Sequence, residues 1–259
     1  MRTFTFKSLF LTVLFVLLGS TAIQAADDGF ITRQITLKLD EAGTLPNKIS
    51  YDQKNLITNL KIVGKINGTD LKFIREMAGC NFYMGKTDGK LSILDLSEAK
   101  IVEGGSAYVS NSDSYWYTSN DKLGGYVFYG CSGLTSLTIP SSVTSIGYYA
   151  FWDCSGLNSI YVYPEKMPEL GTDIFNGCDA KNCIVYVPKG TDIVYWSSEF
   201  GYFEKIVEFD ATGIDKVTTS TNAKEVSRYS VNGKRLSAPA KGLNIVKYSD
   251  GSVKKVVVQ

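Results

Sequence analysis

The chain repeats one pattern of hydrophobic and polar positions three times. The copies begin at Val127, Ala150 and Ile174 and read Val-Phe-Tyr-Gly-Cys-Ser-Gly-Leu, Ala-Phe-Trp-Asp-Cys-Ser-Gly-Leu and Ile-Phe-Asn-Gly-Cys-Asp-Ala-Lys. The phenylalanine and the cysteine of each copy recur after 23 and then 24 residues. A repeat of this size cannot bury its own apolar face and stacks on its neighbours, so the period predicts a solenoid.

Each copy leads into a segment in which apolar and polar residues alternate, over residues 134–140, 157–163 and 183–188. Alternation predicts strands, with every second side chain inside. The residues expected inside are Leu137, Ile139, Ile160, Val162, Val185 and Val187. Those expected outside are Ser136, Thr138, Ser159, Tyr161, Tyr163, Ile184 and Tyr186. Val143 and Ile146 predict a second short apolar step between the first two full repeats.

The N-terminal half carries weaker versions of the same pattern. Residues 30–39, 56–64 and 91–96 are strand-like, and 41–51 are rich in turn residues. Apolar residues at 71, 74 and 77 predict a short helix capped by Thr69 or Asp70. Residues 103–126 are expected to be an insertion. We interpret this half as degenerate repeats whose period is stretched by insertions.

The composition changes after Phe209. Residues 210–225 are rich in Thr, Ser, Gly and Ala, which is typical of a linker. Residues 226–259 contain two hairpin patterns that turn at Asn232-Gly233 and Asp250-Gly251. The predicted fold is therefore mainly β with short helices: a repeat solenoid over 26–209, clearest over 127–190, and a small all-β C-terminal domain.

The pattern Phe-x-x-Cys-Ser-x-Leu-x-x-Leu-x-Ile-Pro-x-x-Val-x-x-Ile-Gly-x-x-Ala-Phe, from Phe128 to Phe151, closely resembles the BspA-like leucine-rich repeat family. The resemblance implies a right-handed leucine-rich repeat solenoid of short strands and loops. It also implies an exported bacterial protein, often displayed at the cell surface, that acts in adhesion or ligand binding and not in catalysis.

The tail is similar to C-terminal secretion-sorting domains of Gram-negative surface proteins. The resemblance rests on Tyr229-Ser230-Val231-Asn232-Gly233-Lys234-Arg235-Leu236, on Lys241-Gly242-Leu243-Asn244-Ile245-Val246 and on Lys254-Lys255-Val256-Val257-Val258. It implies passage across the outer membrane, with the secretion machinery as a partner, and often attachment outside it. A plain accessory β domain is the alternative.

The N-terminus has the features of a secretory signal peptide. Arg2 and Lys7 precede an apolar run over 9–18, and small residues lead to a cleavage point after Ala25. The run is too short for a membrane span, which needs about 20 apolar residues. We expect residues 1–25 to be removed and the mature protein to lie at the cell surface, on the outer membrane or outside the cell, without a transmembrane segment.

Composition excludes several activities. The formal charge is +1 for the full chain and −1 for residues 26–259, so its total favours neither nucleic acid nor an anionic membrane surface as a partner. The chain has no histidine, which excludes Ser-His-Asp and Cys-His catalysis and every zinc site that needs histidine. We expect neither a cofactor nor a metal.

The five cysteines and the acidic pairs have structural interpretations. Because Cys131, Cys154 and Cys178 share one repeat position, we expect buried thiols, with a Cys178–Cys183 bridge as the exception. Two pairs of acids invite comparison with the paired carboxylates of glycosidases. They are Asp95 with Glu98 and Glu165 with Glu169, expected on turns and strand ends and in contact with solvent. The chain is therefore not expected to be an enzyme.

Exposed aromatic residues carry the binding hypothesis. Rings at equivalent repeat positions form columns that can hold an apolar protein partner or stack on sugar rings; the alternative is that they shield coil edges and pack on one another. The candidate binding residues are Trp116, Tyr129, Thr138, Trp152, Tyr161, Tyr163 and Tyr186. The leading hypothesis is adhesion or binding to a protein or another macromolecule. Alternatives are a glycan-recognition module and a structural cell-envelope protein without a dedicated ligand.

Overall fold

The computed structural model describes residues 29–111, 114–210, 224–230, 234–248 and 253–258. The signal peptide expected at 1–25, most of the linker and both Asn-Gly and Asp-Gly turns lie outside the described residues.

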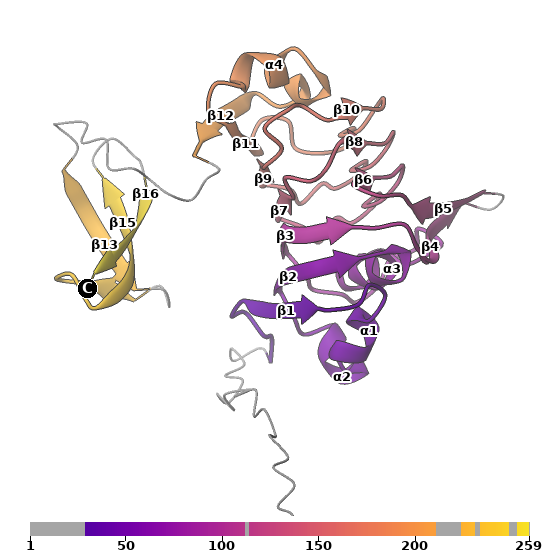
Figure 1. Cartoon of the computed structure of the whole chain (residues 1–259), viewed down its shortest axis with the longest axis horizontal. Coiled ribbons are helices and arrows are strands. Elements are labelled where there is room, and N and C mark those ends of the chain that lie inside the picture. Colours follow the sequence, from indigo (N-terminus) through magenta and orange to yellow (C-terminus); the bar gives the residue numbers. More distant parts are fainter. Residues whose placement is uncertain (1–28, 112–113, 211–223, 231–233, 249–252, 259) are drawn as a thin grey trace, which may run out of the picture.

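One side of the solenoid is a seven-stranded parallel sheet in the order β1-β2-β3-β7-β9-β11-β12 (Figure 1). Its strands are β1 (Ile35–Leu39), β2 (Asn59–Ile66), β3 (Ile93–Ile101), β7 (Ser136–Ile139), β9 (Ser159–Val162), β11 (Ile184–Pro188) and β12 (Lys205–Phe209). The three strands expected in the regular repeats and the three expected upstream are confirmed, although the upstream bounds shift. β12 was not predicted.

A three-stranded parallel sheet lies on another side of the regular coils, in the order β10-β8-β6 (Figure 1). Its strands are β6 (Lys122–Leu123), β8 (Ser145–Ile146) and β10 (Glu169–Leu170). β8 confirms the short apolar step at Val143 and Ile146, both of which are buried.

Short helices cluster at the two ends of the solenoid. They are α1 (Leu45–Lys48), α2 (Tyr51–Lys54) and α3 (Gly68–Met77) in the N-terminal region, with α4 (Asp192–Trp196) and the 3-10 helix η1 (Glu199–Tyr202) near β12. The turn-rich interpretation of 41–51 is therefore wrong over α1, where Pro46 occupies the first turn and Leu45 is buried.

The α3 helix confirms the prediction at 71–77 but begins earlier. Its cap is Asn67 and not Thr69 or Asp70: the Asn67 side chain accepts a hydrogen bond from the Thr69 amide at 3.0 Å. The Asp70 carboxylate accepts one from the Asn67 amide at 2.9 Å, which completes a capping box.

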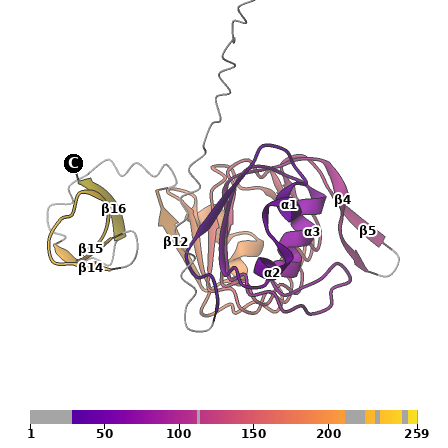
Figure 2. The same ribbon diagram turned by 90° about the horizontal axis from the view of Figure 1, so that it is seen from below.

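The insertion at 103–126 forms an antiparallel hairpin, β4 (Gly104–Asn111) and β5 (Ser114–Thr118). In Figure 2 this hairpin extends on the side of the solenoid opposite to β12. The buried Tyr108 of β4 donates its hydroxyl proton to the Gly125 carbonyl at 2.8 Å, which fixes the hairpin to the coil that follows.

The repeated phenylalanines and cysteines form two columns in the core. Phe151 stacks on Phe128 and on Phe175, with centroids 5.8 and 5.6 Å apart and the rings within 9° of parallel. The Cys154 and Cys178 thiols donate to the carbonyl oxygens of the preceding coil, at 3.1 and 3.2 Å. All five cysteines are buried and free, so the expectation of buried thiols holds and the possible Cys178–Cys183 bridge is absent. The side chains expected inside the repeat strands are all buried.

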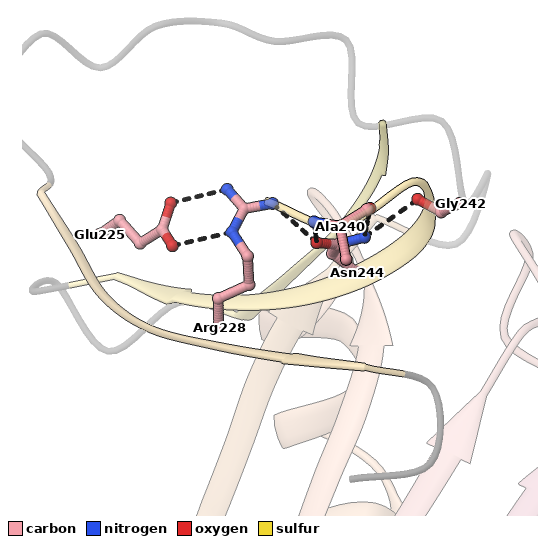
Figure 3. A network of polar contacts seen from close by, with 5 residues as sticks. All are labelled: Glu225, Arg228, Ala240, Gly242 and Asn244. Atoms are coloured by element: carbon pink, nitrogen blue, oxygen red, sulfur yellow. Dashed lines mark hydrogen bonds and ion pairs between the residues drawn. The ribbon is translucent and has the colours of Figure 1, made fainter. Parts of the chain in front are cut away.

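The C-terminal residues form a four-stranded antiparallel sheet in the order β14-β13-β15-β16. Its strands are β13 (Glu225–Ser230), β14 (Arg235–Leu236), β15 (Gly242–Tyr248) and β16 (Val253–Val258). Both expected hairpin pairings are present. A polar network centred on the buried Arg228 and Asn244 holds β13 to β15 (Figure 3).

Candidate binding site

The candidate residues lie in two aromatic clusters. The sheet cluster, on the outer face of the seven-stranded sheet, consists of Tyr161, Tyr163, Tyr186 and Phe209. The turn cluster, where β5 meets the connections that follow β6 and β8, consists of Trp116, Tyr126, Tyr129, Tyr148, Tyr149 and Trp152.

In the sheet cluster, strand register brings the rings together. Tyr161 and Tyr186 are paired across β9 and β11, and their rings are 4.5 Å apart and within 6° of parallel. Phe209 packs its ring nearly perpendicular to Tyr161 at 6.0 Å and to Tyr163 at 5.1 Å. The stacked rings of Tyr161 and Tyr186 therefore cover each other's faces, and both side chains are half-buried.

The row of side chains that contains Tyr161 continues across the sheet into charged residues. Thr138 is paired with both Tyr161 and Asp95, and Asp95 with Lys61. The Lys61 ammonium is 3.4 Å from the Asp95 carboxylate and 2.7 Å from that of Glu98. Burial acts to lower the pKa of Lys61, but the two carboxylates outweigh it and raise that pKa above its usual value.

Asp95 and Glu98 therefore differ from their expected setting. They were expected on turns and strand ends, whereas both lie within β3 and bind one ammonium group; Glu98 is in contact with solvent, as expected, and Asp95 is half-buried. Both carboxylates are therefore engaged in ion pairs with the same lysine.

Tyr163 connects the sheet cluster to a hollow of about 740 Å³. The hollow is lined by Ser141, Val143, Thr144, Tyr163, Pro164, Glu165, Lys166, Met167 and Pro168. Burial and the nearby Asp95 raise the pKa of Tyr163, while Lys61 acts to lower it. The phenol therefore stays protonated and can donate a hydrogen bond at neutral pH.

The turn cluster is a continuous set of tilted rings centred on Tyr126. The ring centroid of Tyr126 lies 4.7 Å from that of Trp116 and 5.1 Å from that of Tyr149. Tyr149 in turn lies 5.0 Å from Trp152. The Trp116 indole donates its Nε1 proton to the Tyr148 hydroxyl at 3.2 Å, and Tyr148 is 43% exposed.

Two rings of the turn cluster are on left-handed backbone. Tyr126 has φ of 58° and Tyr149 has φ of 55°, at the same repeat position, two residues before the ladder phenylalanine. A bulky residue in this region costs about 1–2 kcal/mol relative to glycine. The ring contacts of the turn cluster offset this cost and explain how tyrosine is accommodated there.

The residues that the sequence groups as one exposed patch are thus divided. Thr138, Tyr161, Tyr163 and Tyr186 belong to the sheet face, while Trp116, Tyr129 and Trp152 belong to the turn cluster; no ring contact joins the two clusters in the part of the chain that the structure describes. Sequence reasoning missed Tyr126, Tyr148, Tyr149 and Phe209. The spacing of 23 residues between Tyr126 and Tyr149 was the available signal.

Part of the chain matches a known repeat family. Residues 121–237 match the family model of the BspA type Leucine rich repeat region, in 6 copies. The match supports a BspA-like leucine-rich repeat protein, and repeats of this family generally serve binding or adhesion and are generally not catalytic. No curated protein matches the chain.

Within the described ranges, no helix is long and apolar enough to cross a membrane. In the same ranges, no group of three or more Cys, Asp or Glu side chains is placed to hold a metal ion.

Proposed function

We propose that the protein is exported and displayed at the cell surface, where its solenoid binds a protein partner through the sheet cluster. The observation that carries the proposal is that Tyr163, one of the four packed rings of the sheet cluster, also lines a hollow of about 740 Å³. Aromatic anchors beside a hollow are typical of interface hot spots.

The ring geometry favours a protein over a glycan at this site. Tyr161 and Tyr186 lie side by side in a row with Thr138 before them and Val207 after them. Their faces are therefore flanked by neighbours, whereas stacking on a sugar needs an open ring face. Each tyrosine carries a hydroxyl group that can form a hydrogen bond with a polypeptide. The half-buried Phe209 and the exposed Met167 add apolar surface.

Binding of residues 26–259 to extracellular matrix proteins, cells and polysaccharides tests the proposal. Tyr161→Ala with Tyr186→Ala is expected to weaken binding to a protein ligand at least about tenfold. Tyr51→Ala with Tyr83→Ala is the matched control, because both rings are exposed and lie outside the cluster. Equal loss in both variants, or binding to no protein, contradicts the proposal.

A glycan ligand remains the second candidate, and the turn cluster is its site. Tyr148 is exposed, and the exposed Asp153 is close enough to contribute, after burial, to the raised pKa of Tyr129. Rings beside a carboxylate suit a sugar, which offers both apolar faces and hydroxyl donors. Glycan-array binding that is lost on Trp152→Ala but kept on Tyr161→Ala would support it. Binding to neither proteins nor glycans would favour a structural envelope protein.

We propose that the C-terminal sheet is a separate domain that serves in secretion sorting, which its sequence resemblance supports. Labelling of surface proteins on intact cells, with and without residues 213–259, tests this. Display that is unchanged after the removal contradicts the sorting role. Mass spectrometry of the mature N-terminus tests cleavage after Ala25.

A further inference from the structure

The charge of the chain is divided unequally between the solenoid and the tail. Residues 26–210 contain 16 Lys and Arg against 23 Asp and Glu, a formal charge of −7. Residues 224–259 contain eight Lys and Arg against two acids, a formal charge of +6. The nearly neutral total therefore conceals a basic segment of 36 residues attached to an acidic solenoid.

The C-terminal sheet displays part of its positive charge and pairs the carboxylate of Glu225. Lys234, Arg235 and Lys241 are exposed. Glu225 accepts hydrogen bonds from Arg228 on both oxygens, at 2.9 and 2.7 Å (Figure 3). These bonds lower the pKa of the Glu225 carboxyl and keep it ionised and paired. The exposed basic residues therefore face little competition from acids within the described part of the sheet.

A hollow of about 560 Å³ lies beside β13 and β14 in this sheet. It is lined by Glu225, Val226, Ser227, Arg228, Arg235, Leu236 and Ser237. The Arg235 guanidinium and the two serine hydroxyls are the donor types that bind phosphate oxygens, and a guanidinium binds them through two parallel N–H groups.

We propose that the C-terminal sheet binds a membrane surface rich in anionic phospholipid, with a headgroup phosphate in this hollow. A flat anionic surface attracts the tail and repels the solenoid, so it orients the molecule with the solenoid pointing away from the membrane. A long nucleic acid is the less favoured polyanion, because it would run past the acidic solenoid. The proposal does not depend on the ligand of the sheet cluster.

Vesicle binding by residues 26–259 tests the proposal. The probes are vesicles of phosphatidylcholine alone and of phosphatidylcholine with an equal part of phosphatidylglycerol. We expect binding to the anionic vesicles only, and weaker binding as ionic strength rises to about 0.15 M. Equal binding to both vesicles, or tighter binding to a DNA duplex, overturns the proposal.

Charge-reversal variants locate the contact. K234E/R235E/K241E is expected to weaken vesicle binding about 100-fold, since each basic residue near an anionic surface contributes about 1 kcal/mol. K65E/K86E/K90E is the matched control, with three exposed lysines of the solenoid reversed, and is expected to bind as the parent chain does. Equal loss in both triple variants contradicts a contact through the tail.

Two single substitutions test the hollow. Arg235→Gln is expected to weaken binding about tenfold, and Lys241→Gln, which removes the same charge outside the hollow lining, less than that. An equal loss of vesicle binding in Arg235→Gln and Lys241→Gln would show that only the net charge matters, and it would contradict a phosphate site in the hollow. Displacement from vesicles by micromolar inorganic phosphate would identify a site for free phosphate and overturn the lipid assignment.

Discussion

The N-terminal coils, residues 29–120, and the regular coils, 121–203, are stabilised in different ways. In the regular coils the same contact recurs in each repeat, as in the stack of Phe128, Phe151 and Phe175. In the N-terminal coils single buried polar residues join distant segments. The buried Asp70 carboxylate accepts hydrogen bonds from the amides of Gly43, Leu45 and Asn67, from two different loops.

Arg75 joins the two regions. It is fully buried at the end of α3, and its Nη1 donates to the carbonyl oxygens of Tyr126 and Val127, at 2.9 and 3.0 Å. Its Nη2 lies 3.3 Å from the Cys80 sulfur and from the Asn81 carbonyl oxygen. No carboxylate in the described part of the chain pairs with it. The regular coils are thus stabilised by equivalent contacts in every repeat. The N-terminal coils depend instead on a few buried polar side chains, such as Asp70 and Arg75.

The largest expected effect is the loss of the central ring of the ladder. Phe151→Ala removes a ring that is covered on both faces, and we expect the free energy of unfolding to fall by about 3–5 kcal/mol. Urea unfolding followed by far-ultraviolet circular dichroism measures the change. Phe151→Leu, which keeps most of the volume, is the control; an equally large loss there would show that ring stacking matters more than the cavity.

The next effect tests the junction between the regions. Arg75→Met keeps the length of the side chain but leaves the part-buried Tyr126 carbonyl and the buried Val127 carbonyl without their donor. We expect a loss of about 2–3 kcal/mol in the free energy of unfolding. A loss near zero would mean that water or relaxed backbone satisfies these carbonyls and that Arg75 does not join the regions.

The dependence of stability on pH separates the thiols of the two regions. A hydrogen bond from Cys131, opposed by burial and helped by Arg75, lowers the pKa of Cys80 to about 7. The unfolded thiol titrates near about 8.5. The stability that Cys80 contributes is therefore present above about pH 8.5 and is lost as the pH falls through about 7. Cys80→Ala is expected to flatten this acid side of the profile.

The ladder thiols act in the opposite direction. Burial raises the pKa of Cys154 well above its usual value and that of Cys178 to about 12. Both remain protonated in the folded chain while the unfolded thiols ionise above about pH 8.5, so stability falls as the pH rises beyond that value. Cys154→Ala should reduce only this alkaline loss. A change on the alkaline side in Cys80→Ala, or on the acid side in Cys154→Ala, would contradict the pKa directions given for these two thiols.

The smallest effect is expected on the outer face of the regular coils. Ser159 donates its hydroxyl proton to the Ser136 hydroxyl at 2.9 Å, on the half-exposed side of the sheet. Ser159→Ala is expected to cost about 0.5–1 kcal/mol by thermal unfolding. A cost comparable to that of Phe151→Ala would show that the outer face also carries the fold.

The regular coils could be predicted almost residue by residue, because a period aligns equivalent positions and alternation then assigns their faces. The cap of α3 could not: Thr69 and Asp70 were the predicted caps, but Asn67 is the cap, and Asp70 bonds instead to the amides of Asn67 and Gly43, a contact that exists only in the folded chain. The turn cluster was missed for a related reason. Trp116 contacts Tyr126 only because the β4–β5 hairpin folds back on the coil that follows it. Trp116 lies outside the repeat pattern, so the repeat spacing does not predict this contact.

The ladder is closed at its C-terminal end: Phe200 and Phe203 both pack against Phe175, with ring centroids 4.9 Å apart, and occupy the place of a further coil. A duplicated unit of 23 residues can therefore enter only between existing coils, where it reproduces the contacts of its neighbours. Each such unit would lengthen the solenoid by about 4.8 Å and move the hairpin away from the α4 end by the same step. The number of coils therefore sets the distance between the hairpin and the α4 end, and this distance can change by whole repeats while both ends keep their structure.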